Sequence, residues 1–75
     1  MSGGEPGREI EIRLNGQLKS VPATTTLAGL LEALGKDPRT VAIERNGDIV
    51  RRAAFAQTEI AAGDALEVVQ FVQGG

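Results

Sequence analysis

The groups best suited to chemistry lie in the last residues of the chain, which read Phe71-Val72-Gln73-Gly74-Gly75. Because glycine has no Cβ, a Gly-Gly segment can enter a narrow slot and approach a ligand closely. The terminal carboxylate of Gly75 is unhindered, so a partner that binds ATP could activate it. We therefore expect Gly75 to be the reactive residue, with Gln73 and Gly74 presented to partners beside it. The alternative is a frayed end without function, since chain termini are often disordered.

The residue types that are absent restrict the chemistry of the chain itself. The sequence has no Cys and no His. This removes thiolate nucleophiles, thiolate metal sites and the commonest general base. No pair of carboxylates stands out in a candidate cleft. We therefore predict that the chain is not an enzyme, that it has no catalytic residues, and that it binds no metal or cofactor of its own.

Charge and hydropathy argue against two classes of partner. The net charge is -2, basic and acidic residues are mixed along the chain, and two Phe are the only aromatic residues. This composition lacks the basic surface and the stacking residues of a nucleic-acid-binding protein. No apolar run is as long as a membrane span, and no signal peptide opens the chain. We expect a cytoplasmic protein that binds neither nucleic acid nor a membrane.

The first regular pattern predicts a β-hairpin. Residues 9–14 alternate strictly between polar and apolar, which is typical of a half-buried strand. The dipeptide Asn15-Gly16 favours a tight type I′ turn. We expect the returning strand over residues 17–21, ending at Pro22 because proline cannot donate to a strand ladder.

Leucine spacing predicts an amphipathic helix after this hairpin. The threonines at 24–26 are candidate N-caps, and Gly35 stands where a left-handed C-cap residue belongs. Apolar residues recur at i, i+3, i+4 and i+7, so one face of the helix is apolar. We expect this face to pack on a sheet, since two turns are too few for a coiled coil. The residues of the apolar face are Leu27, Leu30, Leu31 and Leu34.

The second half of the chain predicts further strands. Residues 41–45 and 49–50 read as two short strands joined by a tight turn at Asn46-Gly47. We expect residues 51–57 to be irregular or a helical turn anchored by Phe55. The longest apolar run of the chain predicts the final strand, which we place at residues 66–72.

The order of these elements predicts an α+β protein with the β-grasp, or ubiquitin-like, fold. One main helix lies across one face of a mixed sheet. The first and last strands pair in parallel at the centre, which a crossover helix makes possible. We expect the domain over residues 9–72, a disordered lead-in over residues 1–8, and a flexible reactive tail over residues 73–75.

Several short segments of the chain recur, in the same order and spacing, in one family of small proteins. The segments are Leu14-Asn15-Gly16, Thr26-Leu27 with Leu30-Leu31, Val41-Ala42-Ile43-Glu44-Arg45-Asn46-Gly47, Ile49-Val50 with Arg52, and Gly63-Asp64 with Leu66-Glu67-Val68-Val69 and Gly74-Gly75. Through them the chain, from about residue 12 to its end, resembles the ThiS family of ubiquitin-like sulfur carriers of thiamin biosynthesis. Two departures occur, because Arg51 stands where members often have Pro and Phe55 stands where they often have Trp.

The resemblance implies a specific chemistry for the tail. A ThiF-like adenylating enzyme would join the Gly75 carboxylate to AMP from MgATP. A sulfur nucleophile, derived from a donor such as a cysteine desulfurase, would displace AMP and leave a thiocarboxylate. The sulfur would then pass to a ThiG-like thiazole synthase. ATP and magnesium belong to the partner in this scheme, and the acyl-adenylate and the thiocarboxylate are covalent states of the tail.

Alternation along the final strand predicts a docking surface beside the tail. If Leu66 and Val68 face the helix, the intervening side chains lie on the opposite face of the sheet. That set is Glu67, Val69 and Phe71. Its apolar members could dock a partner or could pack on local loops. Arg52, with Arg45 and Arg51, is a further candidate for charge contacts, although scattered arginines are usually just solvated.

Three other functions fit the same pattern. The small subunit of molybdopterin synthase shares the fold and the tail, but its members often carry a Pro-Pro pair before the glycines, which residues 69–73 lack. A ubiquitin-like modifier would use the same carboxylate to attach to lysines. A plain interaction module would make no use of the tail.

Overall fold

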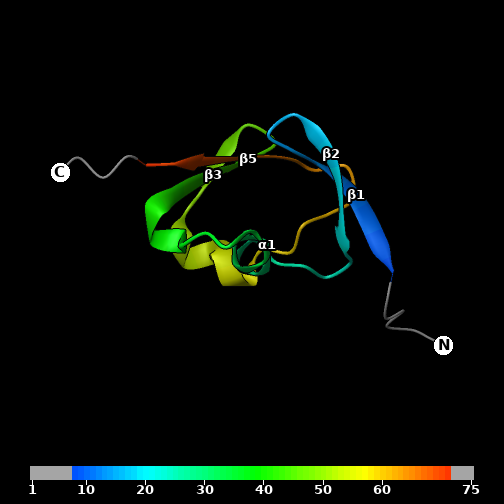
Figure 1. Cartoon of the computed structure of the whole chain (residues 1–75), viewed down its shortest axis with the longest axis horizontal. Coiled ribbons are helices and arrows are strands. Elements are labelled where there is room, and N and C mark those ends of the chain that lie inside the picture. The colour runs from blue at the N-terminus through cyan, green and yellow to red at the C-terminus, as the bar shows by residue number, and fades with distance from the viewer. Residues whose placement is uncertain (1–7, 72–75) are drawn as a thin grey trace.

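The computed structural model describes residues 8–71 and contains a five-stranded mixed sheet covered on one face by helices. The strand order is β2-β1-β5-β3-β4, which places the first and last strands side by side at the centre. Figure 1 shows α1 and the adjoining 3-10 helix under one face of the sheet, which we call the inner face. The elements are β1 (Glu9–Leu14), β2 (Gln17–Pro22), α1 (Leu27–Leu34), η1 (Pro38–Thr40), β3 (Val41–Arg45), β4 (Asp48–Val50), η2 (Arg52–Gln57) and β5 (Ala65–Gln70). The predicted β-grasp architecture is confirmed.

Two Asn-Gly turns form the two hairpins. Asn15 and Gly16 both have positive φ, 51° and 84°, as a type I′ turn requires. Asn46 and Gly47 repeat this geometry between β3 and β4, with φ of 52° and 90°. The first hairpin pairs each residue from 9 to 14 with one from 22 to 17, so β2 includes Pro22, one residue more than expected.

The helix α1 begins and ends as its sequence predicts. The Thr26 hydroxyl accepts a hydrogen bond from the Gly29 amide at 3.0 Å, which caps the first turn. Gly35 closes the helix with φ of 73°, and its amide donates to the Glu32 carbonyl. Leu30 and Leu31 are completely buried against the sheet, so the apolar face packs as predicted.

The core lies between α1 and the inner face of the sheet. Residues 51–57 were expected to be irregular or a helical turn; Arg52–Gln57 form the 3-10 helix η2, and Phe55 is buried as its anchor. The short helix η1 was not predicted. The buried apolar residues are Ile12, Val21, Leu27, Leu30, Leu31, Val41, Ile43, Phe55, Ile60, Leu66 and Val68.

The boundaries of the domain differ in detail from the predicted ones. The final strand begins one residue earlier than expected and ends at Gln70 rather than at residue 72. The Arg8 carbonyl accepts a hydrogen bond from the Ala23 amide at 2.9 Å. Apart from Arg8, the expected disordered lead-in over residues 1–8 lies outside the described residues, and so does the expected flexible tail at 73–75. Within residues 8–71, no helix is long and apolar enough to cross a bilayer.

Candidate functional site

The strand β5 leads directly to the tail and is held from both sides. It pairs in parallel with β1 through Arg13↔Ala65 and Leu14↔Leu66. On its other side it pairs with all of β3, in antiparallel register. Beyond the strand, the Phe71 amide donates to the Thr40 carbonyl at 2.8 Å. The chain is therefore fixed up to Phe71, four residues before Gly75.

The side chain of Asn15 extends the short ladder between β1 and β5. The backbone amide of Asn15 donates to the Leu66 carbonyl at 2.8 Å. Its Oδ1 accepts from the Val68 amide at 2.8 Å, and its Nδ2 donates to the Val68 carbonyl at 3.4 Å. The side-chain amide thus bonds β5 as the next residue of a strand would. The turn residue of the first hairpin therefore also holds the strand that carries the tail.

The second Asn-Gly turn holds the start of β5 in the same way. The Asn46 amide donates to the Ala65 carbonyl at 2.7 Å, and the Ala65 amide donates to Asn46 Oδ1 at 2.9 Å. Asn46 Nδ2 also donates to Asp64 Oδ1 at 3.0 Å. Each turn therefore uses an asparagine side chain to bind β5 or the residue just before it.

Asp64 is the buried carboxylate at the entry to β5. Its side chain is 6% exposed. Burial raises the pKa of Asp64, but the hydrogen bonds from the Ala61 amide, Arg45 and Asn46, with the positive charge of Arg45, outweigh burial and hold this pKa below its usual value. Arg45 Nε and the Ala61 amide both donate to Oδ2 at 2.8 Å. Asp64 is therefore ionised at neutral pH and organises the turn before β5.

The face of the sheet away from α1, which we call the outer face, carries the residues predicted to dock partners. Leu66 and Val68 are buried, whereas Val69 is 55% and Phe71 50% exposed, and Glu67 is exposed as well. This is the alternation expected from the sequence. Ile49 of β4 is 64% exposed. We call Ile49, Glu67, Val69 and Phe71 the outer patch.

Register places two carboxylates within the outer patch region. Glu44 of β3 is paired with Glu67 of β5 on one side and with Ile49 of β4 on the other. Like charges directly opposite each other weaken a sheet. This arrangement places negative charge between the apolar side chains of the outer patch.

The predicted arginines Arg45 and Arg52 lie on different elements of the fold, β3 and η2. Arg52 begins η2, which packs against α1, and its positive charge acts on Asp37. Arg45 is engaged with Asp64 in the ion pair described above. The assignment of Arg52 to a partner surface with Glu67, Val69 and Phe71 stays a prediction. Gln73, Gly74 and Gly75 lie outside the described residues, and their roles stay predictions.

Sequence reasoning missed the parts of the site that depend on asparagine and aspartate side chains. Asn15 and Asn46 were interpreted only as turn residues, and Asp64 was noted only as part of a segment that carries the family resemblance. One signal for these bonds was present in the sequence. Both turns have Asn at a position where Gly would also allow positive φ, and only Asn adds a side-chain amide that can form hydrogen bonds. Among residues 8–71, no cluster of three or more Asp or Glu side chains is arranged to hold a metal ion.

A model of the ThiS family matches residues 12–75. The chain belongs to the ThiS family. The "Sulfur carrier protein ThiS" of Bacillus subtilis is 32% identical over 65 residues, which cover 85% of this chain and 98% of that protein. A crystal structure of a thiamine biosynthesis protein (ThiS) from Geobacter metallireducens superimposes with a TM-score of 0.73 at 32% identity, covering 88% of this chain and all of that one.

Longer proteins also contain a segment similar to this member of the ThiS family. A "Thiazole synthase" of Paramagnetospirillum magneticum is 41% identical, and one of Magnetococcus marinus is 42% identical, each over 66 residues. These matches cover 88% of the present chain but only 20% of either relative. The chain thus spans about a fifth of the length of these two proteins.

Proposed function

We propose that this chain is a sulfur carrier of thiamin biosynthesis that carries sulfur as a thiocarboxylate on Gly75. The observation that carries the proposal is the ThiS family match, which extends through the Gly-Gly segment to residue 75. The fold supports it, because β5 is bound on both sides and holds the chain up to the start of the tail. The match also covers 98% of the B. subtilis relative, which is named a sulfur carrier.

The proposed reaction proceeds in two steps on the Gly75 carboxylate. A carboxylate is a poor electrophile, so an adenylating partner first transfers AMP to it from MgATP and releases pyrophosphate. A hydrosulfide ion, released by a thiol reductant from the persulfide of a donor such as a cysteine desulfurase, then attacks the carbonyl carbon and displaces AMP; the thiol reductant and the donor thiol end as a disulfide. The carrier acts as a co-substrate, and the partners supply the catalytic groups.

The outer patch is the surface we propose for docking the adenylating enzyme. Val69 and Phe71 are half exposed at the point where the chain leaves the sheet, so a partner bound there is close to the tail. The facing carboxylates of Glu44 and Glu67 favour a partner with a basic side chain between them. Such a contact would relieve their repulsion and position the tail in the partner.

A thiazole synthase is the sulfur acceptor that we propose. In two relatives, a segment similar to this chain forms a fifth of a protein named thiazole synthase. Two domains joined in one polypeptide meet at high effective concentration, which favours direct transfer from one to the other. We propose that the separate chain docks on a thiazole synthase in the same way. Because adenylation requires ATP, we place this cycle in the cytoplasm.

The proposal is tested by intact-mass spectrometry of the purified chain. The chain is incubated with a ThiF-like enzyme, MgATP and sulfide. We expect a mass increase equal to replacement of one oxygen by sulfur, absent when Gly75 is deleted. No increase, with an enzyme that loads another carrier, would contradict the proposal. A product joined through the same carboxylate to lysine side chains would instead identify a protein modifier.

A further inference from the structure

The outer edge of β2 offers backbone groups that no other described residue occupies. β2 is the first strand in the sheet order and has only β1 as a neighbour. The Ala23 amide donates to the carbonyl of Arg8, which directly precedes β1. This bond shows which residues of β2 direct their backbone groups toward β1. Alternation then directs the N–H and C=O groups of Leu18 and Ser20 away from β1. The opposite edge strand, β4, is half as long, with three residues against six.

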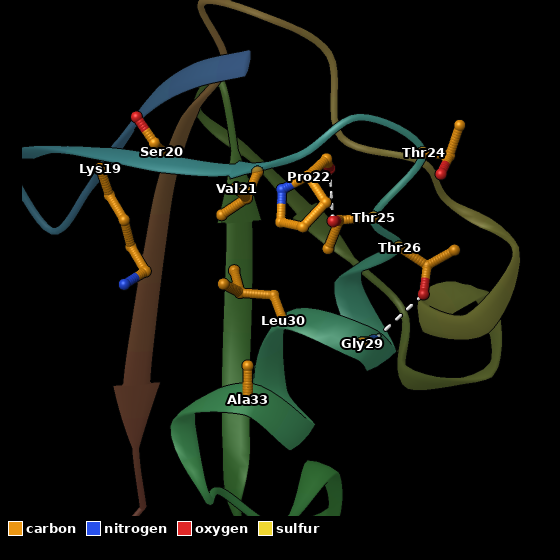
Figure 2. Close-up of a pocket in the computed structure, with 10 residues that line it drawn as sticks. All are labelled: Lys19, Ser20, Val21, Pro22, Thr24, Thr25, Thr26, Gly29, Leu30 and Ala33. Carbon is orange, nitrogen blue, oxygen red and sulfur yellow. Dashed lines mark hydrogen bonds between the residues drawn. The ribbon is translucent and has the colours of Figure 1, made fainter. Parts of the chain in front are cut away.

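A pocket of about 430 Å³ lies directly beside this edge, between β2 and α1. Figure 2 shows Val21, Leu30 and Ala33 forming its apolar floor, with the Lys19 side chain directed to the same side and Ser20 to the other. Lys19 and Val21 pair with the inner-face residues Ile12 and Ile10. Lys19 is the only charged residue among those that line the pocket.

We propose that this edge binds an extended segment of a partner protein, which adds to the sheet as a strand beside β2. The backbone of the segment pairs with Leu18 and Ser20, while its alternate side chains enter the pocket. An acidic side chain lies opposite Lys19, and an aliphatic side chain two positions away lies opposite Val21 and over Leu30. The recognised feature is therefore an aliphatic and an acidic residue on the same face of a short strand.

The end of β2 limits the site to these two backbone positions. Pro22 has no N–H group to offer, and its carbonyl already accepts from the Thr25 amide at 3.1 Å. At the other end, Gln17 adjoins the Asn15-Gly16 turn. The partner segment is therefore short, and its affinity depends on the side chains in the pocket as well as on the backbone.

A second copy of the chain fits this edge poorly. Antiparallel pairing of two β2 strands through Leu18 and Ser20 places the Lys19 residues of the two copies directly opposite each other. Like charges in that position weaken strand pairing, and lysine on an edge strand commonly prevents it. A register shift in one direction brings Pro22 into the ladder, where it removes a donor, and a shift in the other direction brings in Gly16 of the turn, which leaves fewer strand residues to pair. The same lysine favours a heterologous strand with an acidic residue.

This edge is separate from the surface used by the proposed carrier function. The pocket lies on the α1 side of the sheet, whereas the outer patch lies on the opposite face, on β4 and β5. β5 is separated from β2 by the whole of β1. The chain can therefore bind such a segment whether or not its tail is engaged, and the two proposals stand or fall independently.

The test is an NMR titration of the 15N-labelled chain with a synthetic peptide of eight residues. The peptide has one valine and one glutamate two positions apart in a threonine background. We expect saturable shifts and slower hydrogen exchange at the Leu18 and Ser20 amides. Ser20→Pro, which removes one outward N–H without touching the ladder to β1, should abolish binding, and Ser20→Ala should retain it. Shifts confined to the outer patch, or none, would overturn the proposal.

A charge exchange tests the role of Lys19 and does not depend on whether the proline variant folds. Lys19→Glu should weaken binding of the glutamate peptide about fivefold. The variant should instead bind more tightly a peptide that has lysine in place of the glutamate. Equal affinity of both peptides for both proteins would refute the acidic specificity. Shifts at Leu18 and Ser20 that grow with protein concentration alone would make a second copy the occupant and would also overturn the proposal.

Discussion

At the scale of single residues, the molecule uses short polar side chains to fix the strand that carries the tail. Asn15 and Asn46 each combine a positive φ with side-chain hydrogen bonds to the backbone at or near β5. A glycine would adopt the same turn but would leave those backbone groups without these partners. The asparagines therefore contribute to stability in two ways that can be separated by mutation.

Asn15→Gly should destabilise the protein by about 1–2 kcal/mol, because the turn is kept while the bonds to Val68 are lost. Asn15→Asp keeps the acceptor for the Val68 amide and should cost less. The free energy of unfolding in urea measures both variants. Equal stability of Asn15→Gly and the unmodified protein would mean that the side-chain bonds contribute nothing.

Asp64 should make stability depend on pH in the acid range. Because its pKa is lower in the folded state than in the unfolded chain, its contribution is present above about pH 4 and is lost as the pH falls through the folded pKa. Asp64→Asn should cost about 1–3 kcal/mol at pH 7, and the difference between the two proteins should shrink towards pH 3. Asp37, whose pKa is lowered by Arg39, is present in both proteins, so its contribution cancels from the difference in their free energies of unfolding. A difference that is constant with pH in urea unfolding would contradict this assignment.

At the scale of elements, local sequence patterns predicted most of the fold, but they could not predict contacts between residues far apart in the sequence. The leucine spacing of α1, the Asn-Gly turns and the alternation of β1 and β5 each depend on residues close in sequence. The bonds from Asn15 to Val68 join residues 53 positions apart and leave no local pattern. The side of the sheet on which η2 packs likewise depends on the path of the whole chain and leaves no local pattern.

The inner face of α1 should determine stability. Leu31→Ala should destabilise the protein by about 2–5 kcal/mol, because the completely buried side chain leaves a cavity against the sheet. The neighbouring exposed position gives the control, since Glu32→Ala should change the free energy of unfolding by less than about 0.5 kcal/mol. Similar losses for both variants would contradict the assignment of stability to packing, since alanine does not lower helix propensity at either position.

The outer face of β5 should determine partner binding and not stability. Val69→Asp adds a charge to the outer patch beside Glu67, so we expect loading by the adenylating enzyme to slow about tenfold. The thermal midpoint should change little, because Val69 is 55% exposed. Ala53→Asp, at an exposed position of η2, is the control and should load normally. Normal loading of Val69→Asp would exclude the outer patch as the docking surface.

At the scale of the whole molecule, the parallel pairing of β1 and β5 separates the two ends of the chain. Parallel neighbours run in the same direction, so the start of β1 and the end of β5 lie at opposite ends of the sheet. The proposed carrier therefore presents its tail at one end, with the outer patch leading to it. Material attached before β1 is remote from both, and material attached after the tail blocks the carboxylate.

This geometry predicts opposite effects for additions at the two ends. A folded domain joined before Met1 should leave sulfur loading unchanged, because β1 begins at the end of the sheet away from the tail. A single alanine added after Gly75 should abolish loading, because the carboxylate then belongs to a bulkier residue and is displaced along the partner's slot. Intact-mass measurements on the two extended proteins compare their sulfur loading, and unfolding curves show that the domain is native in each. Loading of the alanine-extended chain would place the sulfur on a group other than the Gly75 carboxylate and would remove the basis of the carrier mechanism.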